Sequence, residues 1–396
     1  MLNWLTQIGA LLAFNLRSLP QRSGSAIASI FGIAGVVAVF VGVLSIGQGF
    51  RHAMTASGSP ETAIVVRSGA DSEMTSILQR EETRIISEAP GIGRNAQGPL
   101  VSPELFVIIN LPKRSTHTDS NVVIRGVEAP VFDVRNQVKI VSGRPFRWGQ
   151  NEVIVGRGAL FENEGLDLGS DLTLGQSRWK VVGTFEANGG LSESEIWADA
   201  AVLAPAYHRG STYQVVAAKL ASAGNFARFK DALTSDPRLN VKVERETDFY
   251  AQQSQLLYKI ITGLGTLIAG LMAIGAVFSA LNTMYTAVAS RSREIATLKA
   301  LGFGASPVVV SVMIESLILA AIGGAAGAII ARLAFHGYRA ATMNWTSFSQ
   351  VSFAFDVSWK LLLEGITYAL LIGVIGGLLP AIRAARMPVA HALRES

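Results

Sequence analysis

Four long apolar stretches divide the chain into segments suited to lipid and segments suited to water. They run from about 25–47, 260–285, 307–331 and 361–382. A helix needs about 20 mostly apolar residues to cross roughly 30 Å of hydrocarbon, and each stretch is long enough. The first two contain no charged residue, the third contains only Glu315 and the fourth only Glu364. The pattern predicts four transmembrane helices.

A separate short element precedes the first span. Apolar residues recur there at helical spacing, beside two arginines and before a proline: Trp4, Leu5, Ile8, Leu11, Leu12, Leu16, Arg17, Pro20 and Arg22. We expect residues 1–24 to form an amphipathic helix on the cytoplasmic face of the membrane. The first span, 25–48, is long for a signal peptide and begins after this element, which favours a retained anchor over a cleaved signal.

Positive charge is concentrated in three short segments that flank the spans and, with an even number of spans, face the same side. Arginines and lysines occur before span one, between spans two and three, and after span four: Arg17, Arg22, Arg291, Arg293, Lys299, Arg383, Arg386 and Arg394. Positively charged short loops stay in the cytoplasm. We therefore predict cytoplasmic N- and C-termini, an extracytoplasmic domain over 49–255, a membrane domain over 256–396, and a short outer loop from about 332 to 360.

The extracytoplasmic segment has the pattern of a soluble α+β domain. Strands are predicted over 63–67, 101–110, 121–127, 152–155, 171–174, 178–185, 215–220 and 241–244, and helices over 71–89 and 224–234. Strands and helices mix at both ends of this segment, with a β-rich insert between them. The polar run 248–257 is compatible with a helix and is expected to continue into the second span as one long helix.

Small residues in the last two spans predict close helix packing, because lipid provides no hydrophobic drive for helices to associate. Gly323 and Gly327 form one GxxxG motif, and Gly373 and Gly377 form another. Glu315 has two interpretations. It is a proton relay or substrate contact, or it bonds to a neighbouring helix. A relay needs further polar residues within the spans, so the structural interpretation is favoured.

The segment between spans two and three predicts a short amphipathic helix over about 289–301. Good helix formers fill it, Gly302 and Gly304 follow it, and Pro307 suits the start of the next helix. Ile295, Leu298 and Leu301 could share an apolar face. From the residues alone this helix is equally compatible with a docking element for a partner and with a solvated loop.

The same segment carries a family resemblance. SRSREIATLKALGFGASPVVVSVMIESLILAAIGGAAG, together with the closing GLLPAIRAARMPVAHALRES, resembles the FtsX-like permease domain, and VSGRPFRWGQNEVIVGRGALFENEGLDLGSDLTLGQSRWKVVGTFEANGG resembles the extracytoplasmic domain of MacB-type permeases. The resemblance covers most of the chain from about residue 122. It implies that the short helix is a coupling helix seated on an ABC ATPase, with contacts from Arg291, Arg293, Glu294, Ile295, Leu298 and Lys299.

The resemblance also implies the function and the partners. We expect a multi-pass permease of the bacterial cytoplasmic membrane, paired with a second permease as a homodimer or heterodimer, that exports a substrate by transmitting the movements of a separate ATPase. A periplasmic membrane-fusion protein is a further partner in this scheme. The alternatives are a regulator of partners such as cell-wall hydrolases, or a lipoprotein-releasing permease. A membrane-anchored enzyme or receptor is a third class, which no residue pattern supports.

The sequence lacks the residues and motifs of several kinds of catalytic, nucleotide-binding and metal site. The sequence has no cysteine, no GxxxxGK[ST] loop and no HExxH motif, and its five histidines lack metal-site spacing. We therefore expect no catalytic residue, no metal and no cofactor, with ATP held by the partner. Ser177 and Lys180 match SxxK inside an expected strand, which indicates coincidence. The net charge of +5 comes from the flanks of the spans, so no nucleic-acid partner is expected.

Overall fold

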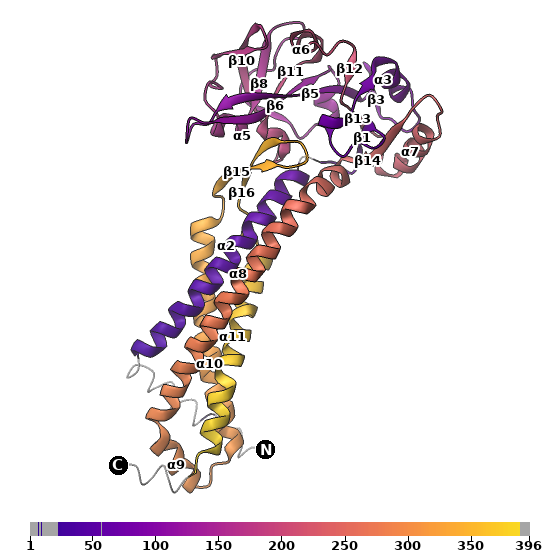
Figure 1. The fold of residues 1–396 in the computed structure, drawn as a ribbon. Coiled ribbons are helices and arrows are strands. Elements are labelled where there is room, and N and C mark those ends of the chain that lie inside the picture. Colours follow the sequence, from indigo (N-terminus) through magenta and orange to yellow (C-terminus); the bar gives the residue numbers. More distant parts are fainter. Residues whose placement is uncertain (1–6, 8, 10–22, 57, 389–396) are drawn as a thin grey trace. The chain divides into compact units, whose positions relative to one another are not determined.

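The computed structural model describes residues 7, 9, 23–56 and 58–388 (Figure 1). Apart from residues 7, 9, 23 and 24, the amphipathic helix expected over 1–24 lies outside the described residues, and so does Arg394. The chain separates into two compact units. The helical unit contains residues up to 47, 260–338 and those from 356 onward. The head unit contains 48–259 and 339–355.

The predicted spans are helices. They are α2 (Ser23–Ala56), α8 (Glu246–Ser290), α10 (Ala305–Phe335) and α11 (Trp359–Arg386), each long and apolar enough to cross a membrane. Helix α8 confirms the expectation that the polar run after residue 248 continues into the second span. The short helix α9 (Ser292–Ala300) lies between α8 and α10 in sequence. In the helical unit, buried valines and isoleucines of α2 pack with alanines and leucines of α10 and α11.

The head unit is built on one mixed ten-stranded sheet, in the order β14-β1-β13-β5-β6-β11-β8-β10-β7 with β9 on β10. The strands are β1 (Thr62–Arg67), β5 (Val101–Pro112), β6 (Asp119–Val127), β7 (Lys139–Gly143), β8 (Glu152–Gly156), β9 (Asp171–Leu174), β10 (Ser177–Glu186), β11 (Glu195–Asp199), β13 (Val215–Lys219) and β14 (Val241–Arg245). Pairs β6–β11 and β8–β10 are parallel and the others are antiparallel.

Short elements complete the head unit. The helices are α3 (Arg80–Ser87), α4 (Val131–Val134), α5 (Arg157–Glu162), α6 (Ala200–Ala206) and α7 (Phe226–Thr234), with 3₁₀ turns η2 (Glu73–Thr75), η3 (Leu191–Ser194) and η4 (Ala223–Asn225). Three small antiparallel pairs are β2 (Leu78–Gln79) with β12 (Thr212–Tyr213), β3 (Arg94–Asn95) with β4 (Gly98–Pro99), and β15 (Arg339–Asn344) with β16 (Ser349–Ala354).

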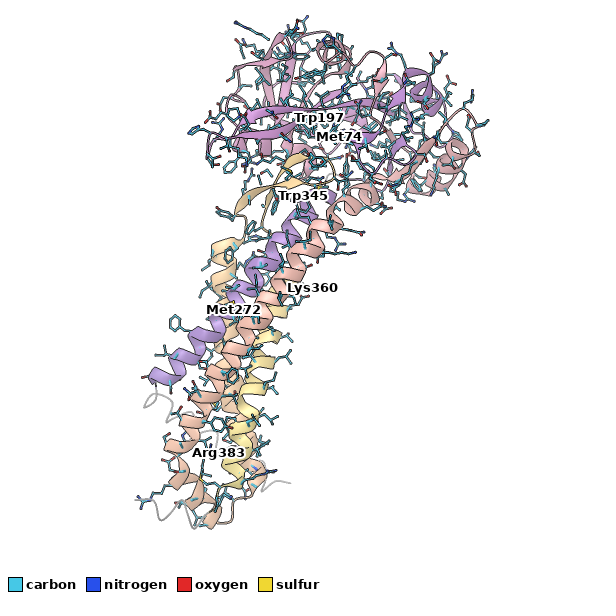
Figure 2. The ribbon with its side chains drawn as sticks, viewed as in Figure 1. Met74, Trp197, Met272, Trp345, Lys360 and Arg383 are labelled. Carbon is cyan, nitrogen blue, oxygen red and sulfur yellow. The ribbon has the colours of Figure 1, made fainter. Side chains whose placement is uncertain are left out.

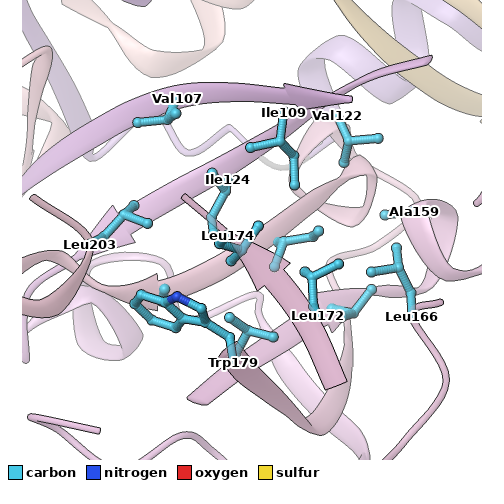
Figure 3. Packing of buried hydrophobic residues seen from close by; sticks show 14 of the residues in the cluster. Val107, Ile109, Val122, Ile124, Ala159, Leu166, Leu172, Leu174, Trp179 and Leu203 are labelled. Carbon is cyan, nitrogen blue, oxygen red and sulfur yellow. The ribbon is translucent and has the colours of Figure 1, made fainter. Parts of the chain in front are cut away.

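Strand β5 joins the two parts that the sequence predicted, a mixed α/β lobe and a β-rich lobe. Its first four residues pair with β13, and the remaining residues pair with β6. The lobe with α3 and α7 therefore shares one sheet with the β-rich lobe. Successive residues of the central strands point to opposite faces. Val153 and Val155 enter the core shown in Figure 3, whereas Ile154 enters a second core that contains Trp197.

One local expectation was wrong. The helix expected over 71–89 is only α3, because a capping box fixes its start. Glu82 accepts a hydrogen bond from the backbone N–H of Gln79 at 2.6 Å, and the Gln79 side chain accepts one in return. The outer loop expected over about 332–360 contains the β15–β16 hairpin. Its alternation of Val351 and Phe353 with serine is the period-two pattern of a strand, and both residues are buried.

Candidate coupling site

Helix α9 ends in a Schellman motif that the sequence encodes locally. Gly302 has a φ of +94°, the left-handed conformation that glycine adopts at little cost. The N–H of Phe303 donates to the carbonyl of Leu298, and the N–H of Gly302 donates to that of Lys299, each at 3.1 Å. Phe303 and Leu298 also join the same apolar cluster. The helix is therefore short and sharply bounded.

The apolar face of α9 packs inward. Ile295 is buried and Leu298 is half-buried in a cluster with valines of α8 and α10 and alanines of α11: Val288, Val308, Val312, Ala381 and Ala384. These two residues, predicted as contacts to an ATPase, are placed by the structure against the chain's own long helices. They hold α9 in position.

Arg291 and Glu315 form a buried ion pair. An Nη1 of Arg291, which directly precedes α9, donates to a carboxylate oxygen of Glu315 on α10 at 3.2 Å. Their side chains are only 8% and 5% exposed. Glu315 thus bonds to a neighbouring element, as the structural interpretation supposed. The guanidinium of Arg291 lies in the interior rather than on a surface open to a partner.

Lys299 connects α9 to the end of α11. Its ammonium group donates to the backbone carbonyl oxygens of Ala385 and Met387 at 2.8 and 2.9 Å. The last carbonyls of a helix lack partners within the helix, and a cation there also complements the helix dipole. Nearby, the guanidinium of Arg383 on α11, labelled in Figure 2, lies 5.4 Å from the ring centre of Tyr285 on α8. Helix α9 is thus tied to α10 and α11, while α11 contacts α8.

The outward face of α9 differs from the predicted set. Arg293 and Glu294, which belong to the predicted set, are exposed. Thr297 and Leu301, which do not belong to it, are exposed as well, and Leu301 is 73% exposed. Residues 293, 297 and 301 recur every four positions, so they share one helix face. The sequence therefore carried a signal for Thr297 and Leu301. Placing Leu301 on the inner face with Ile295 was wrong.

The predicted packing glycines lie at close helix contacts. An added Cβ at Gly323 or Gly327 would lie 3.0 or 2.4 Å from backbone oxygens of α2. At Gly373 and Gly377 it would lie 2.5 and 2.7 Å from side-chain carbons of α10. Such distances leave no space for a side chain. All four glycines therefore serve packing inside the chain.

Of the four long helices, α8 has the smallest share of its most apolar stretch buried by the rest of the chain. Only 17% of its most apolar window is buried, against 44–50% for the other three long helices. Leu256 and Ile268 are exposed on this helix, and six further exposed apolar residues recur at spacings of four and three: Ile260, Leu264, Leu267, Leu271, Ile274 and Phe278. This is the 3.5-residue repeat of a helix that packs along another helix. We call this row of residues the α8 seam.

Comparison with known proteins adds two family matches. The FtsX-like permease C-terminal model matches residues 266–389, and the MacB-like periplasmic core domain model matches residues 26–236. Together they cover α10 and α11, nearly all of α2, α8 from residue 266 onward and most of the head unit.

Individual relatives are distant. The uncharacterized ABC transporter permease YknZ of Bacillus subtilis is 24% identical over 98% of this chain and 97% of its own length. The macrolide export ATP-binding/permease protein MacB of Escherichia coli is 26% identical over 90% of this chain, which spans about half of that protein (56%). The solved periplasmic region of MacB from Actinobacillus actinomycetemcomitans aligns with a TM-score of 0.37 and 14% identity, covering 50% of this chain and 95% of that structure.

Proposed function

Because the chain belongs to the MacB/FtsX family of ABC transporter permeases, we propose that it is the membrane subunit of an exporter driven by a separate ATPase that docks on α9. The observation that carries this proposal is the division of α9 into two faces. One face is fixed to the long helices by Ile295, Lys299 and the neighbouring Arg291, and the other presents Arg293, Thr297 and Leu301 outward.

A displacement of α9 by a partner would act directly on three long helices, through side-chain contacts and through the chain itself. The Arg291–Glu315 pair leads to α10, the Lys299 hydrogen bonds lead to α11, and the chain itself leads into α8. The 396 residues contain no P-loop, and in this proposal the nucleotide is held by a separate ATPase. The names of several relatives specify macrolide export, which supports export over a purely regulatory role. None of these features identifies the substrate that is exported.

The docking proposal is tested by Leu301→Asp. The full-length chain is purified from its native membrane, and co-purifying proteins carrying an ABC ATPase motif are identified and quantified by mass spectrometry. We expect wild type to retain such an ATPase and Leu301→Asp to lose at least tenfold of it. Leu168→Asp, at an exposed leucine of the head unit, is the matched control and should retain it. A wild-type chain without an ABC ATPase, or an unchanged Leu301→Asp complex, would overturn the proposal.

We further propose that the α8 seam contacts the α8 of a second permease, here a second copy of this chain. The 3.5-residue repeat supports helix pairing, and the packing glycines of α10 and α11 are already occupied within the chain. The chain is free of cysteine, so single cysteines report directly. Oxidation of Leu271→Cys should give a covalent dimer, whereas Leu371→Cys, an exposed leucine on α11, should give little. Equal yields of covalent dimer from the two variants would argue against pairing of two chains along the α8 seam.

The orientation belongs to the same proposal. Positive flanks put α9 in the cytoplasm and the head unit outside. A membrane-impermeant maleimide applied to intact spheroplasts should label Lys180→Cys in the head unit and spare Arg293→Cys until the membrane is opened. Labelling of both from one side would reject this topology and the ATPase contact with it.

A further inference from the structure

The head unit buries a set of charges that the docking proposal does not use. Four glutamates, two arginines and a tyrosine from distant parts of the sequence lie together, each at most 3% exposed: Glu73, Glu104, Arg125, Arg135, Glu195, Glu246 and Tyr250. We call this set the ion cluster. It brings together η2, β5, β6, β11, the residue after α4 and the first turns of α8.

Arg125 on β6 is the centre of the ion cluster. Its guanidinium donates to both carboxylate oxygens of Glu195 at 2.8 and 2.7 Å, to both oxygens of Glu73 at 2.8 and 3.2 Å, and to Glu104 at 2.7 Å. Glu195 also accepts from the indole N–H of Trp197 at 2.8 Å. Paired hydrogen bonds of this kind fix geometry as well as supplying energy. Three segments of the head are therefore held at one point.

Arg135 extends the ion cluster to α8. It donates to both oxygens of Glu104 at 3.2 and 3.1 Å and to Glu246, the first residue of α8, at 2.5 Å. Glu104 thus bridges the two arginines. Burial alone would raise the pKa of Glu104, but the charges of Arg135 and Arg125 hold that pKa below its ordinary value. The carboxylate is therefore the stable form.

A second link starts one turn further along α8. The hydroxyl of Tyr250 donates to Glu73 at 2.9 Å, so α8 reaches Arg125 through Glu73 as well as through Arg135. Phe249, beside it, is also buried. Helix α8 then runs without interruption to Ser290. Two consecutive turns of this helix are therefore held by hydrogen bonds to Arg135 and Glu73, which in turn bond to Glu104 and Arg125 of the sheet.

Core stability does not account for these charges. Burying charges is costly, and replacing a buried ion pair with apolar side chains of similar volume is often neutral or stabilising. Four carboxylates also face only two guanidiniums. Such a cluster does supply a directional connection, since its bonds hold in one relative position of helix and sheet, whereas apolar surfaces tolerate sliding.

We propose that the ion cluster is the joint that locks the first turns of α8 to the head sheet, so that movement of α8 is passed to the sheet. Arg135, Glu246 and Tyr250 are then positioning residues for energy transfer. This inference rests on the proposed export function, because only a driven α8 has a movement to transmit.

The anchoring is tested on the full-length chain in lipid nanodiscs by hydrogen exchange. The double variant Arg135→Met with Glu246→Leu removes the first link, between Arg135 and α8, without leaving one of these two charges alone, and keeps the Tyr250–Glu73 hydrogen bond. Asp248→Asn neutralises an exposed acid on the same turn and serves as the control. We expect amides of 246–253 to exchange at least tenfold faster in the double variant, with β6 amides unchanged, and no change in the control. Unchanged exchange, or equal acceleration in β6, would overturn the joint.

The transmission is tested in the complex with the co-purified ATPase. Spin labels at Lys180→Cys in two copies report the distance between head units with and without ATP. We expect an ATP-dependent distance change in otherwise wild-type chains and its loss in the double variant, with ATP hydrolysis within twofold of wild type. A full distance change in the double variant would refute the joint alone. No change in wild-type chains would refute the export mechanism and, with it, the joint's role.

Discussion

Mutating the Arg291–Glu315 pair distinguishes between two roles for Arg291. The family resemblance implies a contact to the ATPase, whereas the structure pairs its guanidinium with Glu315 in the interior. Arg291→Met leaves the Glu315 carboxylate buried without this partner, and Glu315→Leu leaves the guanidinium. Removing one member of a buried pair costs about 3–5 kcal/mol. Replacing both should cost about 1 kcal/mol or less, because the surrounding side chains of α8, α9 and α10 are mostly apolar.

The assay is a double-mutant cycle. The free energy of unfolding is measured by SDS titration in bicelles for wild type, both single variants and the double variant, and ATPase retention is measured on the same samples. We expect an interaction energy of at least about 2 kcal/mol between the two positions. We also expect the double variant to regain both stability and ATPase binding. Arg293→Gln, at an exposed arginine of α9, controls for loss of charge and should leave stability within about 0.5 kcal/mol.

Two outcomes would contradict these roles of the Arg291–Glu315 pair. If the double variant is as stable as wild type but binds the ATPase as poorly as Arg291→Met, then Arg291 contacts the partner directly. If neither single variant loses stability, the pair does not hold α9 on α10.

Three further predictions use other features. Gly327→Ala should destabilise the helical unit by about 1–3 kcal/mol in the same titration, since its Cβ would lie 2.4 Å from a backbone oxygen of α2, whereas Gly263→Ala has no atom within 4 Å and should stabilise slightly. Trp179→Ala should cost the head unit about 3–5 kcal/mol in thermal and denaturant unfolding, because its ring is buried in the core of Figure 3. Hydrogen bonds from Arg144 lower the pKa of Glu152 to about 2. Stability from this pair is thus present above the ordinary carboxyl pKa of about 4.3 and lost as the pH falls toward 2, so Glu152→Gln should flatten that part of an acid titration followed by tryptophan fluorescence.

The membrane helices and most strands of the sheet were predictable because their signals are local. An uncharged run of 20 residues has few alternatives to a membrane helix. Strands such as β8 and β13 are buried on both faces and appear as short continuous apolar runs. The end of α9 was also readable, since Gly302 supplies the left-handed residue that a Schellman motif needs.

The side-chain roles were harder to predict because they depend on distant partners. Nothing near Arg125 in the sequence indicates that it meets Glu73, Glu104 and Glu195, which lie on three other segments. A glutamate that opens a helix, such as Glu246, looks like an ordinary N-terminal acid. Likewise, charge around a short helix between two spans cannot reveal which residues turn inward. Only the fold shows that the ammonium group of Lys299 donates hydrogen bonds to carbonyl oxygens at the end of α11.

The two ends of α8 share one design. Its first residue, Glu246, is held by Arg135 in the head unit, and the residue directly after its end, Arg291, is held by Glu315 in the helical unit. Between them the apolar run contains no charge and is the least buried of the four long helices. Ion pairs are costly to bury and directional once formed, whereas an apolar helix surface can slide against lipid or a second helix. In the proposed export mechanism, a helix held by ion pairs at both ends and apolar between them transmits displacement, so Arg135 and Arg291 are the first positions to test.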